Sequence, residues 1–109
     1  MQIGIVGLGR RGSNIAKRLM SRGHKVVAFD RDAKAVAAIS GAGANGVSSL
    51  KDMVDALAAP RIFWIMLPAG KPTEETVAAL GGWLSRGDTI LDGGNSFFKD
   101  DIRRGKALL

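Results

Sequence analysis

Three glycines near the start of the chain have the spacing of a phosphate-binding turn. Gly7, Gly9 and Gly12 follow an apolar run and precede a stretch with helical periodicity. The first such glycine permits a tight turn, the second lets the backbone approach a pyrophosphate, and the third lets the helix pack against the strand. The pyrophosphate then lies at the positive N-terminus of the helix. This pattern predicts a dinucleotide site, with a plain strand–turn–helix corner as the alternative.

An acidic residue ends the second apolar run, eighteen positions after Gly12. There the Asp30 carboxylate could accept hydrogen bonds from both hydroxyls of an adenosine ribose. Because Asp30 would repel a 2′-phosphate, it favours NAD over NADP, although Arg31 could pair with that phosphate or stack on adenine. Asp30 could instead cap the next helix, a role that suits Asp32 better.

Two arginines stand inside the glycine turn. Arg10 and Arg11 fall in the first turn of the predicted helix, where a cation opposes the helix dipole unless an anion is bound there. Each arginine could contact a pyrophosphate, or its side chain could simply extend into solvent.

Two later stretches are expected to converge on the same crevice, because each follows the carboxyl end of a predicted strand. The first is Leu67-Pro68-Ala69, and the second is Asp92-Gly93-Gly94-Asn95-Ser96. The second offers open backbone, an amide and a hydroxyl, which suit a polyhydroxylated ligand. A turn with only a structural role is the alternative. His24 falls at the opposite edge of the sheet and is not expected to be catalytic, and Lys71 is expected to be merely exposed.

The elements that position these residues alternate along the chain. Predicted strands cover residues 2–7, 25–30, 61–67 and 89–92, with a short strand near 44–47. Predicted helices cover residues 10–22, 32–40, 50–58 after a Ser49 cap, 72–86 and 97–109. This alternation predicts an α/β fold, a Rossmann-type doubly wound parallel sheet truncated to about five strands. Residues 1–109 are expected to form one domain.

Composition excludes several classes of site. The chain has no cysteine, which excludes disulfides and thiolate metal sites and favours a reducing cytoplasm. No metal site and no membrane span are predicted. The net charge of +6 lies entirely within the first 34 residues, which suits an anionic ligand, although a solvated helix face would explain part of it. Nucleic-acid binding is disfavoured because no aromatic platform accompanies the charge.

Four stretches together resemble a known family. "IGIVGLGRRGSNIAKRL", "VVAFDRD", "MLPAG" and "LDGGNS" resemble the N-terminal coenzyme domain of 6-phosphogluconate dehydrogenases, and Asp30 resembles the NAD-preferring branch. These enzymes oxidise 6-phosphogluconate at its 3-hydroxyl by hydride transfer, and the β-keto acid then loses carbon dioxide to give ribulose 5-phosphate. The cofactor implied for this chain is NAD, with NADP as the alternative.

The resemblance also implies a role for each site residue. The pyrophosphate would be held by Gly7, Leu8, Gly9, Arg10, Arg11 and Gly12. The adenosine ribose would be surrounded by Asp30, Arg31 and Asp32. The path to the nicotinamide would be lined by Leu67, Pro68 and Ala69. Asn95 would touch both the coenzyme and the sugar phosphate, with Ser96 beside it.

Two departures from the family pattern qualify these expectations. Arg11 stands where the family usually has methionine. The chain also ends before the all-helical domain that carries the family's catalytic lysine, its "KxxHN" segment and its glutamate acid. The chain alone is therefore expected to bind coenzyme without turnover and to form a homo-oligomer through apolar surface that the helical domain would cover. The alternative function is a standalone nucleotide-sensing module.

Overall fold

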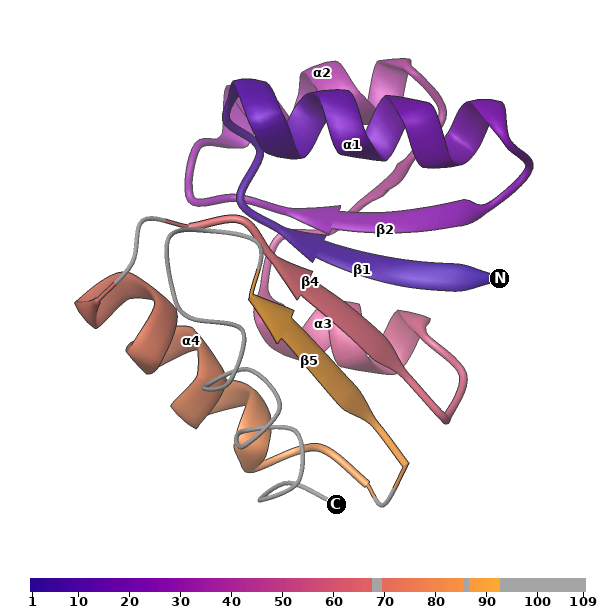
Figure 1. The fold of residues 1–109 in the computed structure, drawn as a ribbon. Coiled ribbons are helices and arrows are strands. Elements are labelled where there is room, and N and C mark those ends of the chain that lie inside the picture. Colours follow the sequence, from indigo (N-terminus) through magenta and orange to yellow (C-terminus); the bar gives the residue numbers. More distant parts are fainter. Residues whose placement is uncertain (68–69, 86, 93–109) are drawn as a thin grey trace.

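The computed structural model describes residues 1–67, 70–85 and 87–92, and these form a parallel sheet with helices on both faces (Figure 1). The strands are β1 (Gln2–Val6), β2 (Lys25–Phe29), β3 (Asn45–Gly46), β4 (Ile62–Ile65) and β5 (Thr89–Asp92). The helices are α1 (Arg10–Ser21), α2 (Ala33–Gly41), α3 (Leu50–Ala56) and α4 (Lys71–Gly81). The strand order is β3-β2-β1-β4-β5, so the predicted doubly wound α/β sheet is confirmed.

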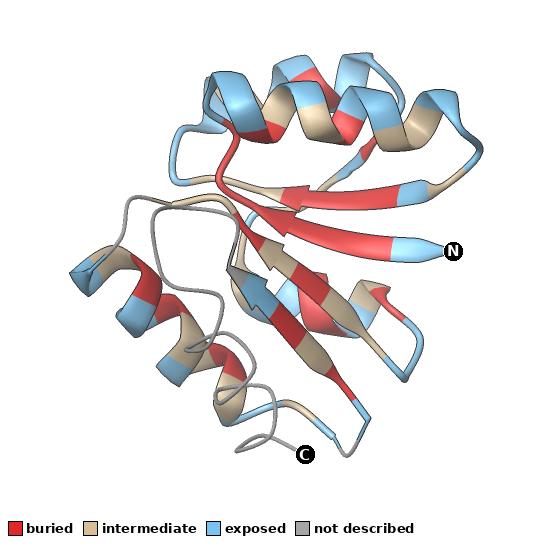
Figure 2. Ribbon diagram, viewed as in Figure 1, coloured by how far each residue is buried: buried red, intermediate tan, exposed pale blue. Residues whose placement is uncertain are grey.

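Both faces of the sheet are buried, which explains why its strands are apolar runs rather than alternating patterns (Figure 2). On one face, Ile3 and Ile5 of β1 pack with Ala16 of α1 and Ile39 of α2. The other face buries residues of β1, β2, β4, β5, α3 and α4 in a second cluster. That cluster comprises Val6, Val27, Met53, Val54, Leu57, Phe63, Ile65, Leu80 and Ile90. Helices α1 and α2 therefore cover one face, and α3 and α4 cover the other.

The boundaries of most elements agree with the predicted ones to within about two residues. Ser49 caps α3 as predicted, since its hydroxyl accepts a hydrogen bond from the Asp52 amide at 3.1 Å. The prediction was wrong for α4, which ends at Gly81 rather than near residue 86, because glycine at positions 81 and 82 disfavours the helix. Trp83 beyond this end is 40% exposed. The predicted helix over 97–109 lies outside the described residues.

A buried ion pair joins the amino ends of β4 and β5. The Asp88 carboxylate is fully buried and accepts hydrogen bonds from the Arg61 amide at 2.6 Å, the Ser85 amide at 2.8 Å and the Arg61 guanidinium at 3.2 Å. The same guanidinium donates to the Val54 carbonyl at 3.0 Å. Burial alone would raise the pKa of Asp88, but the bonds from Ser85 and Arg61 outweigh it and the pKa lies below its usual value.

Replacing Asp88 should destabilise the fold at neutral pH. Asp88→Ala would leave the Arg61 guanidinium and two amides without their partner, and we expect the free energy of unfolding to fall by about 3 kcal/mol. Because the folded-state pKa is lowered, the contribution is present above the unfolded-state pKa and is lost as pH falls towards the folded-state value. Urea denaturation from neutral to strongly acidic pH measures both effects.

Asp55→Ala is the matched control, because its pair with Lys51 is exposed. It should cost less than about 1 kcal/mol. Equal losses for the two variants at neutral pH would contradict the role given to Asp88.

Candidate functional site

The glycine turn connects β1 to α1 at the carboxyl edge of the sheet, and its packing explains two of its three glycines. Gly7 has a φ of 99°, and a Cβ there would lie 2.7 Å from the Met66 carbonyl oxygen. A Cβ at Gly12 would collide with the Gly7 carbonyl oxygen. The tight turn predicted for Gly7 and the close packing predicted for Gly12 are therefore confirmed.

No contact with a described residue requires a glycine at position 9. It has an ordinary φ of −65°, it is exposed, and no described atom lies within 4 Å of the Cβ that another residue would place there. The open space above its backbone is what close approach of a ligand requires. This observation fits the role predicted for Gly9, in which the backbone meets a pyrophosphate.

The N-terminus of α1 carries positive charge without a compensating side chain. Gly9 is the N-cap residue and has no side chain to accept from the first amides of the helix. Arg10 and Arg11 follow, both exposed, and the first turn contains no acidic residue. An anion at this point would be favoured by the helix dipole, by the free amide donors and by the two guanidinium groups.

Asp30 connects the end of β2 to the glycine turn. One of its carboxylate oxygens accepts a hydrogen bond from the Leu8 amide at 2.6 Å, and the other accepts from the Asp32 amide at 2.8 Å. Asp32 caps α2 by accepting from the Lys34 amide at 2.9 Å, so the capping role belongs to Asp32 as the sequence favoured. Two carboxylate oxygens can accept about four hydrogen bonds, which leaves Asp30 able to accept from a ligand.

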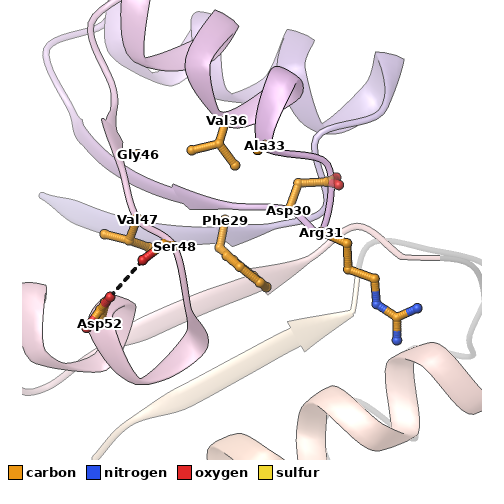
Figure 3. Close-up of a pocket in the computed structure, with 9 residues that line it drawn as sticks. All are labelled: Phe29, Asp30, Arg31, Ala33, Val36, Gly46, Val47, Ser48 and Asp52. Atoms are coloured by element: carbon orange, nitrogen blue, oxygen red, sulfur yellow. Dashed lines mark hydrogen bonds between the residues drawn. The ribbon is translucent and has the colours of Figure 1, made fainter.

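A pocket of about 590 Å³ opens beside Asp30, between the carboxyl ends of β2 and β3 (Figure 3). Its lining residues are Phe29, Asp30, Arg31, Ala33, Val36, Gly46, Val47, Ser48 and Asp52. Apolar side chains make up much of this surface, and charged or hydroxyl groups stand among them, with the Ser48 hydroxyl donating to the Asp52 carboxylate at 3.2 Å. A flat heterocycle carrying a polar sugar matches this combination.

The structure brings together some of the predicted residues. The turn residues, Asp30, Arg31 and Asp32 all lie at the carboxyl edge of the sheet. Leu67 approaches the turn, since its Cδ2 atom would lie 3.1 Å from a Cβ at Gly7. Pro68, Ala69, Asn95 and Ser96 lie outside the described residues.

His24 and Lys71, which were not expected to take part in catalysis, lie where the sequence predicted them. His24 directly precedes β2, at the edge of the sheet opposite the turn. Lys71 begins α4 with an exposed side chain, 3.8 Å from the Glu75 carboxylate. Among the described residues, no group of three or more histidine or acidic side chains could hold a metal ion, and no helix has the length and hydropathy to cross a membrane.

Part of the pocket was not predicted from the sequence. Phe29, Val47, Ser48 and Asp52 were not predicted as site residues, although they line the same hollow as Asp30. Their position in the chain could have identified them, because Phe29 ends β2 and the segment 47–48 follows β3 directly. Residues beyond the carboxyl ends of adjacent parallel strands are expected to meet.

A family model for the NAD binding domain of 6-phosphogluconate dehydrogenase matches residues 2–109. The chain belongs to this family of NAD-binding domains. It is 44% identical over 107 residues to an NAD(+)-dependent, decarboxylating 6-phosphogluconate dehydrogenase of Haloferax volcanii, covering 98% of this chain and 36% of that protein. It is 39% identical over 111 residues to a decarboxylating 6-phosphogluconate dehydrogenase of Staphylococcus aureus, covering 98% of this chain and 24% of that protein.

The fold agrees with this family. The 6-phosphogluconate dehydrogenase of Plasmodium falciparum, whose structures include complexes with NADP+ and with 6-phosphogluconate, superposes with a TM-score of 0.80 at 24% identity. That match covers 98% of this chain and 24% of the other. The NAD-binding domain described here thus spans about a quarter to a third of the length of these relatives.

Gly12 and Gly9 should respond differently to a methyl group. Gly12→Ala should lower the free energy of unfolding by about 3 kcal/mol, because its Cβ meets a backbone carbonyl that cannot move aside cheaply. Gly9→Ala is the matched control and should cost less than about 1 kcal/mol, because its Cβ enters open space at an ordinary φ. Thermal and urea denaturation measure the two losses, and similar values would contradict the packing assigned to Gly12.

Proposed function

We propose that the glycine turn, Asp30 and the adjoining pocket bind one NAD molecule as a continuous surface. The observation that carries the proposal is the hydrogen bond from the Leu8 amide to the Asp30 carboxylate, 2.6 Å long, which places the turn and the acid side by side. The pyrophosphate lies over Gly7–Gly12, the adenosine ribose on Asp30, and the adenine in the pocket bounded by Phe29 and Val47.

The proposed pyrophosphate site rests on the helix terminus and its charges. Gly9 leaves space for the phosphates to approach the first amides of α1. Arg10 and Arg11 supply two exposed positive charges at the same place. Their unfavourable position relative to the helix dipole is relieved when an anion binds, so binding and helix stability support each other.

The proposed ribose site favours NAD over NADP. Asp30 has acceptor capacity beyond its two backbone bonds, and ribose hydroxyls are donors that can use it. A 2′-phosphate in the same position would place negative charge against this carboxylate. We propose that Arg31 and Asp32 border the ribose and that Leu67, with Pro68 and Ala69, lines the path to the nicotinamide.

For the whole enzyme we propose the oxidative decarboxylation of 6-phosphogluconate, the activity named for the Haloferax and Staphylococcus relatives. A bound nicotinamide would supply the acceptor for the hydride that leaves C3 of the sugar, while the 3-hydroxyl loses its proton to a base and becomes a ketone. Asn95 and Ser96 are proposed to contact the sugar phosphate, and Asn95 also the coenzyme. His24 and Lys71 do not serve as an acid–base pair, since His24 lies at the far edge of the sheet and Lys71 faces solvent beside Glu75.

Removing the acid should weaken coenzyme binding. Asp30→Ala should raise the Kd for NAD about tenfold or more, because it removes a charged acceptor for the ribose hydroxyls. Asp55→Ala, on the exposed face of α3, should leave the Kd unchanged. Isothermal titration of the 109-residue chain with NAD measures both values. An unchanged Kd for Asp30→Ala would contradict the ribose assignment.

The 109 residues alone should bind NAD without turnover. When 6-phosphogluconate is added to the chain saturated with NAD, we expect no NADH absorbance above that of a blank, because the proposed acid and base belong to a further domain. Steady formation of NADH would contradict this proposal. The homo-oligomer expected from the sequence stays a prediction, and the exposed Trp83 and Leu91 are apolar groups that would support it.

A further inference from the structure

One cation beside the proposed ribose site is directed away from it. Arg31 follows Asp30 directly, yet the two side chains point apart, with the guanidinium lying over α4 (Figure 3). There its Nη2 atom lies 3.9 Å from Oε2 of Glu75. The Arg31 side chain is 88% exposed, so the ion pair with Glu75 is the contact that directs it towards α4, and as an exposed pair it contributes less than about 1 kcal/mol.

Glu75 stands between two cations at the edge of the pocket. Its other oxygen, Oε1, lies 3.8 Å from the Lys71 ammonium one turn earlier in α4. Glu75 and Arg31 also line a second hollow of about 440 Å³, which shares Phe29, Arg31 and Ser48 with the first pocket. A carboxylate on α4 is thereby brought to the rim of the proposed adenosine site.

The charges around this rim bear on the one group that separates NADP from NAD. A 2′-phosphate is best held by a guanidinium, which can donate two parallel hydrogen bonds to it. Glu75 competes for the guanidinium of Arg31 and adds to the negative charge of Asp30 and Asp52, which line the first pocket. Lys51 and Lys71 each lie beside a carboxylate, at Asp55 and at Glu75 respectively. The exposed Lys34 follows Ala33, which lines the first pocket.

We propose that Glu75 is a specificity-determining residue that disfavours coenzymes bearing a 2′-phosphate. It does so by drawing Arg31 towards α4, where the guanidinium lies 3.9 Å from the Glu75 carboxylate. The inference rests on the proposed NAD site, whose adenosine end it refines. It also explains how a chain with an arginine directly after Asp30 can still prefer NAD.

The test compares the Kd values of NAD and NADP for Glu75→Gln and for the parent chain. The variant should bind NADP about three- to fivefold more tightly, because Arg31 is freed to pair with the 2′-phosphate. The Kd for NAD should change less than about twofold, since the proposed ribose contacts do not involve Glu75. The gain should shrink in high salt. Glu74→Gln is the matched control, because it removes the neighbouring carboxylate of the same helical turn, and it should leave the preference unchanged.

A second substitution identifies the route of the effect. In the double variant Glu75→Gln, Arg31→Gln the gain in NADP affinity should disappear, because the group that would hold the 2′-phosphate is gone. A gain that survives this change, an equal gain in Glu74→Gln, or no gain in Glu75→Gln would each overturn the inference while leaving the NAD site standing. A parent chain that bound neither coenzyme would overturn the proposed function and this inference together.

Discussion

The hydrogen bond between the Leu8 amide and the Asp30 carboxylate is the contact on which the proposed site depends. It joins two segments that follow different strands, β1 and β2, and holds the glycine turn against the acid at 2.6 Å. Asp30 has a second bond, to the Asp32 amide, which fixes the start of the loop into α2. The carboxylate is therefore oriented before any ligand arrives, so less side-chain entropy is lost when a ligand binds.

This contact is possible because of the order of the sheet. Strand β1 lies between β2 and β4, so the turn after it has Asp30 on one side and Met66 and Leu67 on the other. A parallel sheet with both faces covered leaves its carboxyl edge as the place where loops from neighbouring strands meet. The close packing of Gly12 on Gly7 then sets where α1 begins. The strand order and the packing of the turn together fix the position of the N-terminus of α1 relative to Asp30.

The parts of this arrangement that the sequence predicted are those encoded locally. Gly7 and Gly12 are needed for the backbone path of one short turn, and Asp30 is recognised by its place at the end of an apolar run. The pocket was not predicted, because Phe29, Val47 and Asp52 come from three separate elements and meet only in the folded chain. The predicted α4 extended past Gly81-Gly82, but the helix ends at Gly81. Glycine disfavours helical backbone, and the prediction gave this local effect too little weight.

The pairing of Arg31 with Glu75 shows why net charge is a poor guide to the ligand. The chain carries a net charge of +6, which by itself favours any anion. Around the glycine turn the positive charges of Arg10 and Arg11 are exposed beside a helix N-terminus, where a pyrophosphate would be stabilised. At the adenosine end Arg31 is paired with the Glu75 carboxylate, and Asp30 and Asp52 line the pocket. One end of the proposed site therefore offers positive charge to a pyrophosphate and the other offers acceptors to a neutral ribose, and on this difference rests the proposed preference for NAD over its 2′-phosphorylated counterpart.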